Sequence, residues 1–581
     1  MSEVRNLVLA VIASVLIMLG WKFVQDKLFK TSVPVEDVME TEDSLIPDVV
    51  DIVDYESRED ITKRVPRVKF GNSSVEGSVA LVGGILDDLS LSKYKVSIDN
   101  DSPNVHLMSP EGTADSSMVE FGWIDIEHKI KTPSRDSIWS LEESESHDDG
   151  VKSDFSMFWD NGEGVVFRLK FALDDSYVFT VLQEVENNTG KELHLAHYGR
   201  INRAYDTSAK SHWISHEGVV ANFGDGLREW NYKDLKSSHS IKEKGILKEY
   251  GERSWIGFAD KYWFSALISE NTSKNIKTGV PIFRAQHVRK GDEDRFQVDF
   301  SKTYEVIAPR SVASAVSHVF VGAKELDLLD TYKSKMSLPL FDKAVDFGML
   351  YFITKPVFLL LQCFNKIFGN FGLAIVMLTV AIKLLLLPIS AKSCISMFKL
   401  RKLQPEVERI KELYKADNLR ASKEIAALFK KHKVSPISGF LPIIAQIPVF
   451  FALYKVLFVT IEMRHAPLFA WIKDLSNYDP ANVLNLFGLL PFHPPICIGV
   501  MPILLGITMI VQQKLHLKDS VGSQDPYGIM KFLPYVFIFI FSSFPSGLVL
   551  YWICSNVLTV AQQLLIRKIM YRSNVTVGSS A

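Results

Sequence analysis

The sequence predicts an integral membrane protein with six α-helical spans and a large antiparallel β-sandwich domain between the first span and the other five. Three observations predict this fold class. Residues 7–24 form an isolated apolar run near the start of the chain. The last third of the chain contains four further apolar blocks. The long region between them is polar and contains short runs in which apolar and polar residues alternate, as in half-buried strands.

Length, charge and cysteine content limit the possible functions. At 581 residues the chain is long enough for two or more domains. Its formal net charge of -2 argues against nucleic acid as a bulk partner, so we expect no binding to DNA. The cysteines lack the paired spacing of metal ligands and are expected to be small packing residues, so we expect neither a metal nor a cofactor. They are Cys363, Cys394, Cys497 and Cys554.

The first apolar run is long enough for a span, because 17 or 18 residues can suffice where about 20 are typical. A cleaved signal peptide is the alternative, and it requires small residues around a cleavage site just after the run. Here the run is followed by Trp21-Lys22-Phe23, which is unfavourable for cleavage. We therefore expect residues 1–30 to form an uncleaved N-terminal anchor.

Residues 31–64 are acidic and lack apolar periodicity, which predicts a flexible linker. Residues 65–339 are expected to form the β-sandwich. The clearest strand pair is 165–173 and 177–185, joined by the turn sequence Asp174-Asp-Ser176. Alternate residues of the first strand would share one face of the sheet. They are Phe167, Leu169, Phe171 and Leu173.

Residues 340–369 are apolar but interrupted by charges, which predicts an amphipathic helix in the membrane interface. Residues 370–570 are expected to form a five-span core. The last apolar block, 529–566, is too long for one helix and contains the helix-breaking sequence Phe544-Pro-Ser-Gly547. Splitting it gives two spans of about 16 residues, or about 24 Å each, which is shorter than a typical hydrocarbon core and implies local thinning of the bilayer. The other blocks are 370–389, 437–460 and 496–512.

Loop charge predicts the topology. Residues 392–433 contain twelve Lys or Arg and five Asp or Glu, whereas residues 460–495 contain only Arg464 and Lys473 as cations. By the positive-inside rule, the 392–433 loop and the C-terminal tail, 571–581, are cytoplasmic. The β-sandwich then lies outside, and both termini lie inside. Apolar residues recur at three and four residues through the basic loop, which predicts a helical hairpin.

Lys383 lies inside the first block of the core, and a charge within a span indicates function by default. Two structural alternatives are open. Lys383 is five residues before Pro388, so it could snorkel toward the interface. It could also pair with a buried acid, but the apolar blocks contain none. Lys455 and Lys531 lie nearer the ends of their blocks, where snorkelling accounts for them better.

A set of motifs lies in order over about residues 345–570. They are Asn370-Phe-Gly-Leu-Ala-Ile-Val, Lys383, Pro388, Leu403-Gln-Pro405, Ser435 to Pro448, Ala466-Pro, Trp471 to Leu475, and Phe544 to Trp552. In this order they resemble the YidC family of membrane protein insertases. The long bacterial form of this family, which has a periplasmic β-supersandwich, is also similar at Arg5-Asn-Leu7, Phe223-Gly-Asp-Gly-Leu227 and Gly257-Phe-Ala-Asp-Lys-Tyr-Trp263.

The resemblance implies a hydrophilic groove, open to the cytoplasm and lipid, that receives a polar segment of an incoming membrane protein. Lys383 takes the position at which the family most often has arginine, so it keeps the charge without the planar fork. Motif matching names Thr379, Gln513 and Trp552 as groove-lining residues. Gln446 and Tyr551 are further polar candidates for the same groove.

The resemblance also implies partners and a location. The partners are nascent membrane proteins, the lipid bilayer and the Sec translocon, with which the protein would act jointly or alone. The ribosome is expected to bind only weakly through the basic hairpin and tail. The location is the bacterial inner membrane.

The β domain resembles sugar mutarotases, which raises the question of enzymatic activity. His216-Glu217 could supply an acid and a base, but a solvated turn before Gly218 accounts for this pair better. We therefore expect no enzyme. A small-solute transporter or channel is the main alternative function, yet the repeated halves of such proteins are absent from the sequence. A passive membrane-anchored chaperone or sugar-binding protein would leave Lys383 without a role.

Overall fold

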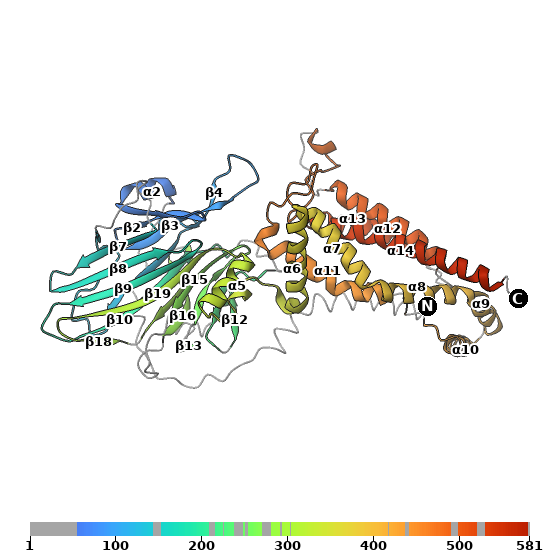
Figure 1. Cartoon of the computed structure of the whole chain (residues 1–581), viewed down its shortest axis with the longest axis horizontal. Coiled ribbons are helices and arrows are strands. Elements are labelled where there is room, and N and C mark those ends of the chain that lie inside the picture. Colours follow the sequence, from blue (N-terminus) through green and yellow to red (C-terminus); the bar gives the residue numbers. More distant parts are fainter. Residues whose placement is uncertain are drawn as a thin grey trace. The chain divides into compact units, whose positions relative to one another are not determined.

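The computed structural model has a β domain followed by a helical bundle (Figure 1). Residues 1–54, which include the expected anchor at 7–24, lie outside the described part of the chain. The structure describes residues 55–578 except 143–152, 208–214, 225, 238–247, 250–253, 270–280, 291–292, 303, 416, 436–437, 439–440, 490–497 and 520–528.

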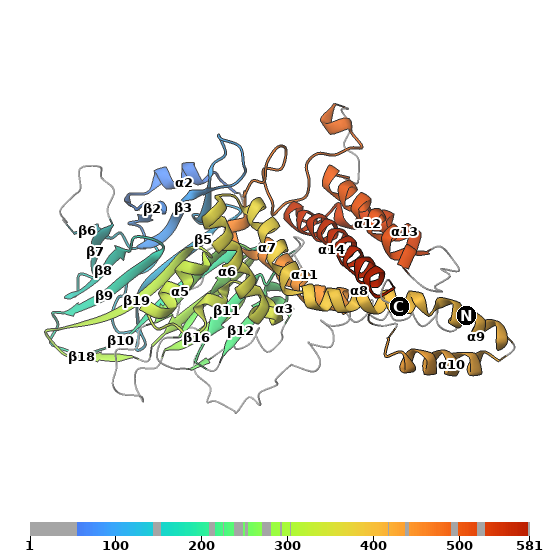
Figure 2. The same ribbon diagram turned by 45° about the vertical axis from the view of Figure 1, so that its right-hand side comes forward.

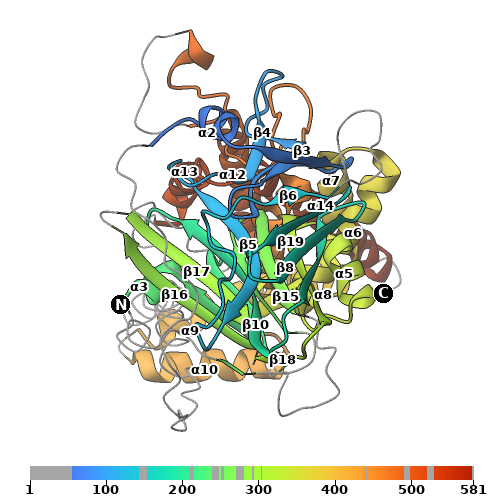
Figure 3. The same ribbon diagram turned by 90° about the vertical axis from the view of Figure 1, so that its left-hand side faces the viewer.

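The β domain consists of two antiparallel sheets, as the alternating pattern predicts. The 10-stranded sheet has the order β1-β2-β3-β5-β10-β17-β16-β13, with β4 on β3 and β18 on β10. Figure 3 shows β10, β17 and β16 side by side. The strands are β1 (Arg67–Gly71), β2 (Val75–Ala80), β3 (Ile85–Lys95), β4 (Asn104–Met108), β5 (Ser117–Asp125), β10 (Leu193–Ala204), β13 (Lys248–Glu249), β16 (Ile282–Lys290), β17 (Glu293–Ser301) and β18 (Glu305–Ile307).

The 9-stranded sheet has the order β12-β11-β14-β15-β19-β9-β8-β7-β6. The predicted hairpin is present as β8 and β9, with Phe171 opposite Val181. The strands are β6 (Ser140–Leu141), β7 (Asp154–Asp160), β8 (Val165–Leu173), β9 (Val178–Asn187), β11 (Gly218–Asn222), β12 (Leu227–Asn231), β14 (Trp255–Ala259), β15 (Trp263–Ser269) and β19 (Ser311–Ala323).

The two sheets enclose one apolar core. The four alternating residues of β8 are all buried in it, as predicted. Aromatic side chains join the sheets, since Phe70 of β1 meets Phe179 of β9 edge-on at 5.0 Å and Phe121 of β5 lies 6.5 Å from Phe171. Full burial of each such side chain contributes about 1.5–3 kcal/mol, so the domain can be stable without disulfides.

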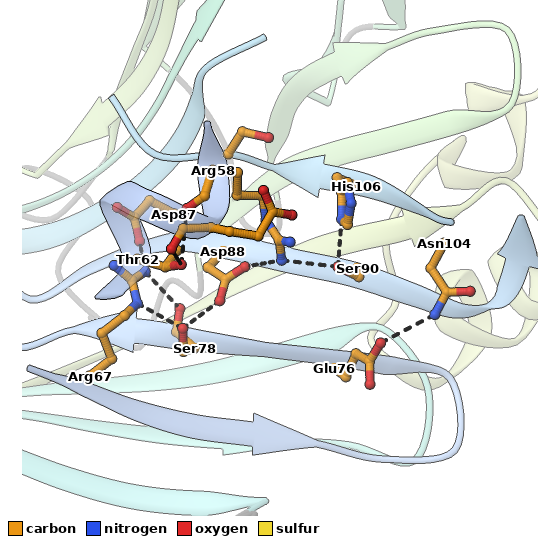
Figure 4. A network of polar contacts seen from close by, with 12 residues as sticks. Arg58, Thr62, Arg67, Glu76, Ser78, Asp87, Asp88, Ser90, Asn104 and His106 are labelled. Atoms are coloured by element: carbon orange, nitrogen blue, oxygen red, sulfur yellow. Dashed lines mark hydrogen bonds and ion pairs between the residues drawn. The ribbon is translucent and has the colours of Figure 1, made fainter. Parts of the chain in front are cut away.

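A charged network holds helix α2 (Arg58–Arg64) against strands of the 10-stranded sheet (Figure 4). Arg58 forms an ion pair with Asp88, and Arg67 forms one with Asp87. Burial raises the pKa of Asp87 to about 6. Ser57 accepts a hydrogen bond from the backbone of Asp60 and caps the helix. The end of the segment expected to be a flexible linker is therefore helical and attached to the sheet.

The described residues of the β domain include two further short helices, α3 (Tyr232–Ser237) and α5 (Leu326–Lys335). The 3-10 turns η1 (Phe341–Ala344) and η2 (Gly348–Leu350) lead to α6 (Tyr351–Phe368), which covers the region expected to be amphipathic. Helix α6 ends at Gly369, whose φ of 66° is in the left-handed region that glycine adopts without strain.

The helical bundle contains the expected apolar helices and the basic hairpin. Figure 2 shows α9 and α10 folding back on one another after α8. The last apolar block breaks between α13 and α14, where the Phe-Pro-Ser-Gly sequence predicts it, although α14 is much longer than the expected 16 residues. The helices are α7 (Phe371–Leu385), α8 (Leu387–Lys402), α9 (Gln404–Leu413), α10 (Asn418–Lys431), α11 (Leu441–Val459), α12 (Val500–Asp519), α13 (Ile529–Phe541) and α14 (Ser546–Gly578).

Among the described residues, two helices are long and apolar enough to cross a membrane by themselves, at Gly348–Phe368 and Ser546–Ile569. A third candidate is the pair α7 and α8, which is bent by 59°. The shorter apolar helices are Ile444–Val459, Val500–Leu515 and Phe532–Phe541. At about 1.5 Å per residue these are shorter than a hydrocarbon core of about 30 Å.

Candidate functional site

Lys383 lies in the last turn of α7 and its side chain reaches two other helices. Its Nζ donates to Gln446 Oε1 of α11 at 3.3 Å and to Thr559 Oγ1 of α14 at 3.0 Å. The Gln446 amide in turn donates to the Tyr551 hydroxyl on α14. The structure therefore brings together three residues that the sequence singled out, Lys383, Gln446 and Tyr551.

The partners of Lys383 are neutral oxygens. Within the described part of the chain, Lys383 takes part in no ion pair, and its side chain is half-buried. A hydroxyl and an amide orient dipoles toward the ammonium group but do not neutralise it. The site thus has a net positive charge at a position surrounded by apolar helices.

The bend after α7 supplies another polar contact to the site. Helix α7 ends at Leu385, and α8 begins with Pro388 in its first turn. The end of a helix leaves carbonyl oxygens without helical partners. The Gln562 amide of α14 donates to the backbone carbonyl of Lys383 at 3.3 Å. We call Lys383, Gln446, Tyr551, Thr559 and Gln562 the Lys383 cluster.

The other predicted groove residues lie elsewhere. Thr379 is fully buried, and its hydroxyl donates to the Ile375 carbonyl of its own helix at 2.7 Å. The ring of Trp552 packs among aromatic residues of α11 and α13, with Phe541 at 4.7 Å and Phe450 at 5.0 Å. Gln513 is half-buried in the last two turns of α12.

Sequence reasoning missed Thr559 and Gln562. Both belong to a polar stripe on α14 that begins at Tyr551 and continues through Ser555. Successive members are three or four residues apart, so they share one face of the helix. Further along, Arg567 donates to the Leu515 carbonyl of α12 at 3.2 Å. The regular spacing of these polar residues within the last apolar block could have identified Thr559 and Gln562 from the sequence.

The structure gives Lys455 a partner that the sequence did not predict. It was expected to snorkel, but its Nζ forms an ion pair with Asp346 Oδ2 at 2.9 Å. Asp346 lies between η1 and η2, before α6. This position is outside the apolar blocks of the core, which contain no acid in the sequence. The same carboxylate accepts a hydrogen bond from the backbone N–H of His216 at 3.0 Å.

The turn at His216-Glu217 was expected to be solvated, but hydrogen bonds to other parts of the β domain hold both residues. His216 contacts the Val219 carbonyl through Nε2 at 3.2 Å, and Glu217 accepts from the Tyr205 hydroxyl at 3.2 Å. These bonds hold the two side chains in structural roles.

A buried carboxyl lies just beyond the end of α11. Burial raises the pKa of Glu462 to about 7. The neighbouring Glu325 accepts from the Tyr94 and Tyr177 hydroxyls, each at 2.9 Å, and does not cap its own helix.

Comparisons with known proteins cover almost the whole chain. A family model described as the YidC periplasmic domain matches residues 67–360, and one described as the 60Kd inner membrane protein matches residues 363–573. The chain is 40% identical over 580 residues to the membrane protein insertase YidC of Rickettsia felis, covering 98% of this chain and 99% of that protein. The chain belongs to the YidC family of membrane protein insertases.

Other members of the YidC family are similar to the same extent. The insertase of Rickettsia africae is 41% identical over 581 residues, and that of Rickettsia prowazekii is 40% identical over 575 residues, each covering 98% of this chain and 99% of the relative. Membership makes the chain an integral protein of the inner membrane with a periplasmic β domain. The family acts by insertion and not as an enzyme, and none of these three relatives is named as a transporter.

Two solved structures are also similar. A crystal structure of an active YidC insertase covers 86% of this chain and 94% of its own, at 17% identity and a TM-score of 0.34. A galactose mutarotase related enzyme from Lactobacillus acidophilus covers 44% of this chain and 97% of its own, at 8% identity and a TM-score of 0.30.

Among the described residues there is no group of three or more His, Cys, Asp or Glu side chains suited to a metal ion.

Proposed function

We propose that this chain inserts newly made membrane proteins by receiving their polar segments at the Lys383 cluster. One observation carries the proposal. The ammonium group of Lys383 is held by neutral oxygens, without an ion pair among the described residues, in the middle of an apolar bundle. A charge in such a place costs free energy unless function requires it.

The cluster would lower the cost of moving a polar segment into the membrane. Lys383 attracts acidic residues of the incoming segment, while the hydroxyl and amide groups of Thr559, Gln446 and Gln562 replace part of its hydration. The apolar helix of the client then moves into lipid, because burial of its apolar surface is favourable. These groups together would form one wall of a groove open to the cytoplasm and to lipid, to which Gln513, Thr379 and Trp552 would belong only indirectly.

The depth of Lys383 supports a cytoplasmic opening. Asn370 caps the start of α7, and Lys383 follows 13 residues later, or about 20 Å along the helix axis. If Asn370 marks the periplasmic surface, Lys383 lies in the cytoplasmic half of a core of about 30 Å. A client segment would thus cross only part of the bilayer before meeting the charge.

We further propose six spans with both termini in the cytoplasm. The excess of cations in residues 392–433 supports this topology. The far end of α11 is connected to the periplasmic β domain, since Arg464 donates to the carbonyls of Lys95 and Val96 at 2.7 and 3.0 Å. Helix α6 would lie in the interface.

The Sec translocon and the ribosome remain proposed partners. Helix α10 of the hairpin exposes more cations than acids, at Arg420, Lys423, Lys430 and Lys431 against Glu424, and such cations suit a polyanion such as ribosomal RNA. The tail contributes few charges, so we expect the ribosome to bind weakly.

Depletion of the protein tests the proposal. Short-tailed membrane proteins should then remain uninserted, and the wild-type chain should restore their insertion while Lys383→Glu should not. Full restoration by Lys383→Glu for every client tried would contradict the proposed role of the charge.

A further inference from the structure

The segment between α11 and α12 exposes several large apolar side chains although it is not part of a long helix. We call its residues 466–489 the outer loop. Among them, bulky apolar side chains are exposed on two parts of the surface, one aromatic and one mostly aliphatic. The first consists of Phe469, Trp471 and Tyr478, and the second consists of Leu484, Leu486, Phe487 and Leu489.

The outer loop is held in place by buried polar groups. Asp479 is buried and accepts from the Trp471 indole at 3.0 Å and from the backbone N–H of Met501, at the start of α12, at 2.7 Å. The Asn482 side chain accepts from the backbone of Leu484 at 3.0 Å. A Cβ at Gly499 would lie 2.5 Å from the Asp479 side chain, so this approach requires glycine.

The loop is also bonded to the starts of two other bundle helices. Asn370, which caps α7, donates to the Leu468 carbonyl at 2.9 Å. Ser546 and Gly547, at the start of α14, donate through their backbone to the carbonyls of Asn477 and Leu475 at 2.7 and 3.0 Å. This part of the outer loop is therefore held against the ends at which α7, α12 and α14 begin.

Two residues of the second group lie on a strained backbone. Leu486 and Phe487 have φ values of 50° and 62°, in the left-handed region that bulky side chains rarely adopt. Such backbone strain persists where the surrounding structure maintains it, and it is concentrated at functional positions. Here the strained residues present apolar side chains outward.

The charge of the loop favours lipid as the occupant. Among described residues 466–489, Lys473 is the only charged residue that is exposed. Asp479 is buried, and Asp474 is half-buried. The Asp474 carboxylate accepts hydrogen bonds from the backbone N–H and the hydroxyl of Ser476 at 2.8 and 2.7 Å. Helix α12, whose first turn is bonded to Asp479, also exposes apolar side chains at Leu504, Ile507 and Val511. Aromatic and aliphatic side chains with few charges are typical of the boundary between headgroups and acyl chains.

We propose that the outer loop is immersed in the periplasmic leaflet of the bilayer and anchors the bundle at a fixed depth. The loop would act as a rigid wedge, because Asp479 and Asn482 maintain its shape. This anchoring rests on the membrane location of the family and the proposed orientation, and it is independent of how clients are recognised. A fixed depth would keep Lys383 in the cytoplasmic half while the short helices thin the bilayer.

Spin labelling of the full-length chain in proteoliposomes tests the proposal. A nitroxide is attached at Phe487→Cys after the native cysteines are replaced by serine, and its collisions with oxygen and with a water-soluble nickel complex are compared. The matched control is Val312→Cys in β19, because Val312 is 61% exposed and Phe487 is 62% exposed. We expect the ratio of oxygen to nickel collisions to be several-fold higher at residue 487 than at residue 312.

A second label at Phe469→Cys guards against a local effect of the substitution at the strained residue, and it should give the same high ratio. Equal ratios at 469, 487 and 312 would mean that the loop is in water and would overturn the proposal. Few collisions with either reagent would mean that a protein, or a second copy of this chain, covers the loop, which would also overturn it. A high ratio only with anionic lipid would assign binding to the charge of Lys473 and contradict the apolar anchor. Insertion activity is recorded separately, so its loss does not affect this result.

Discussion

Replacement of Lys383 by leucine should slow insertion in proportion to the negative charge of the client. The structure gives Lys383 no ion pair among the described residues, so its charge is available to an incoming carboxylate. Two unit charges about 6 Å apart attract by about 3 kcal/mol at an effective dielectric constant of about 20. If this attraction is made in the rate-limiting step, its loss slows insertion about 100-fold.

The assay uses purified protein in liposomes and two clients that differ only by Asp or Asn in the translocated tail, with protease protection as the readout. We expect Lys383→Leu to slow the Asp client about 100-fold, to leave the Asn client nearly unchanged, and to be rescued by Lys383→Arg. Lys514→Leu is the matched control, because Lys514 is an exposed cation near the end of α12 and lies outside the cluster. Equal slowing of both clients by Lys383→Leu would refute the electrostatic reasoning and indicate a loss of structure.

Three further predictions concern stability. Gln446→Leu leaves the buried Tyr551 hydroxyl without its amide donor and should lower the free energy of unfolding in detergent by about 2 kcal/mol, whereas an unchanged denaturation midpoint would contradict the observed bond. Asp346→Asn removes the carboxylate that pairs with the half-buried Lys455 ammonium and should lower the free energy of unfolding by about 2 kcal/mol, an effect largely suppressed by adding Lys455→Met; no suppression would mean that the pair is not the cause. Glu462 has a pKa of about 7 in the folded chain and an ordinary value of 4.5 when unfolded, so the free energy of unfolding should fall by up to about 3 kcal/mol as pH rises between these values, and Glu462→Gln should remove this dependence; identical pH profiles would contradict it.

Local patterns were sufficient for much of the fold. Alternation in residues 165–173 predicts β8 and its buried face, because side chains of a strand point to opposite sides in turn. The Phe-Pro-Ser-Gly sequence predicts the end of α13, because proline and glycine interrupt helical hydrogen bonding. Lys383 itself was visible as a charge in an apolar block.

The rest depends on contacts between distant residues. Thr559 is 176 residues from Lys383, and Asp346 is 109 residues from Lys455, so no local periodicity indicates either pair. Thr379 lies one turn from Lys383 as predicted, but its hydroxyl is satisfied by its own helix. Trp552 directly follows Tyr551, and a rotation of about 100° between neighbours turns it toward the aromatic residues instead.

Crosslinking of a stalled nascent chain tests the central claim most directly. Photoreactive residues are placed at Gln446 and Thr559, which contact the Lys383 ammonium, and at Phe352, which is exposed on α6. Our account predicts that the polar segment of the client crosslinks to positions 446 and 559 and hardly at all to position 352. Equal yields at all three positions, or crosslinks at 352 alone, would contradict reception of the client at the Lys383 cluster.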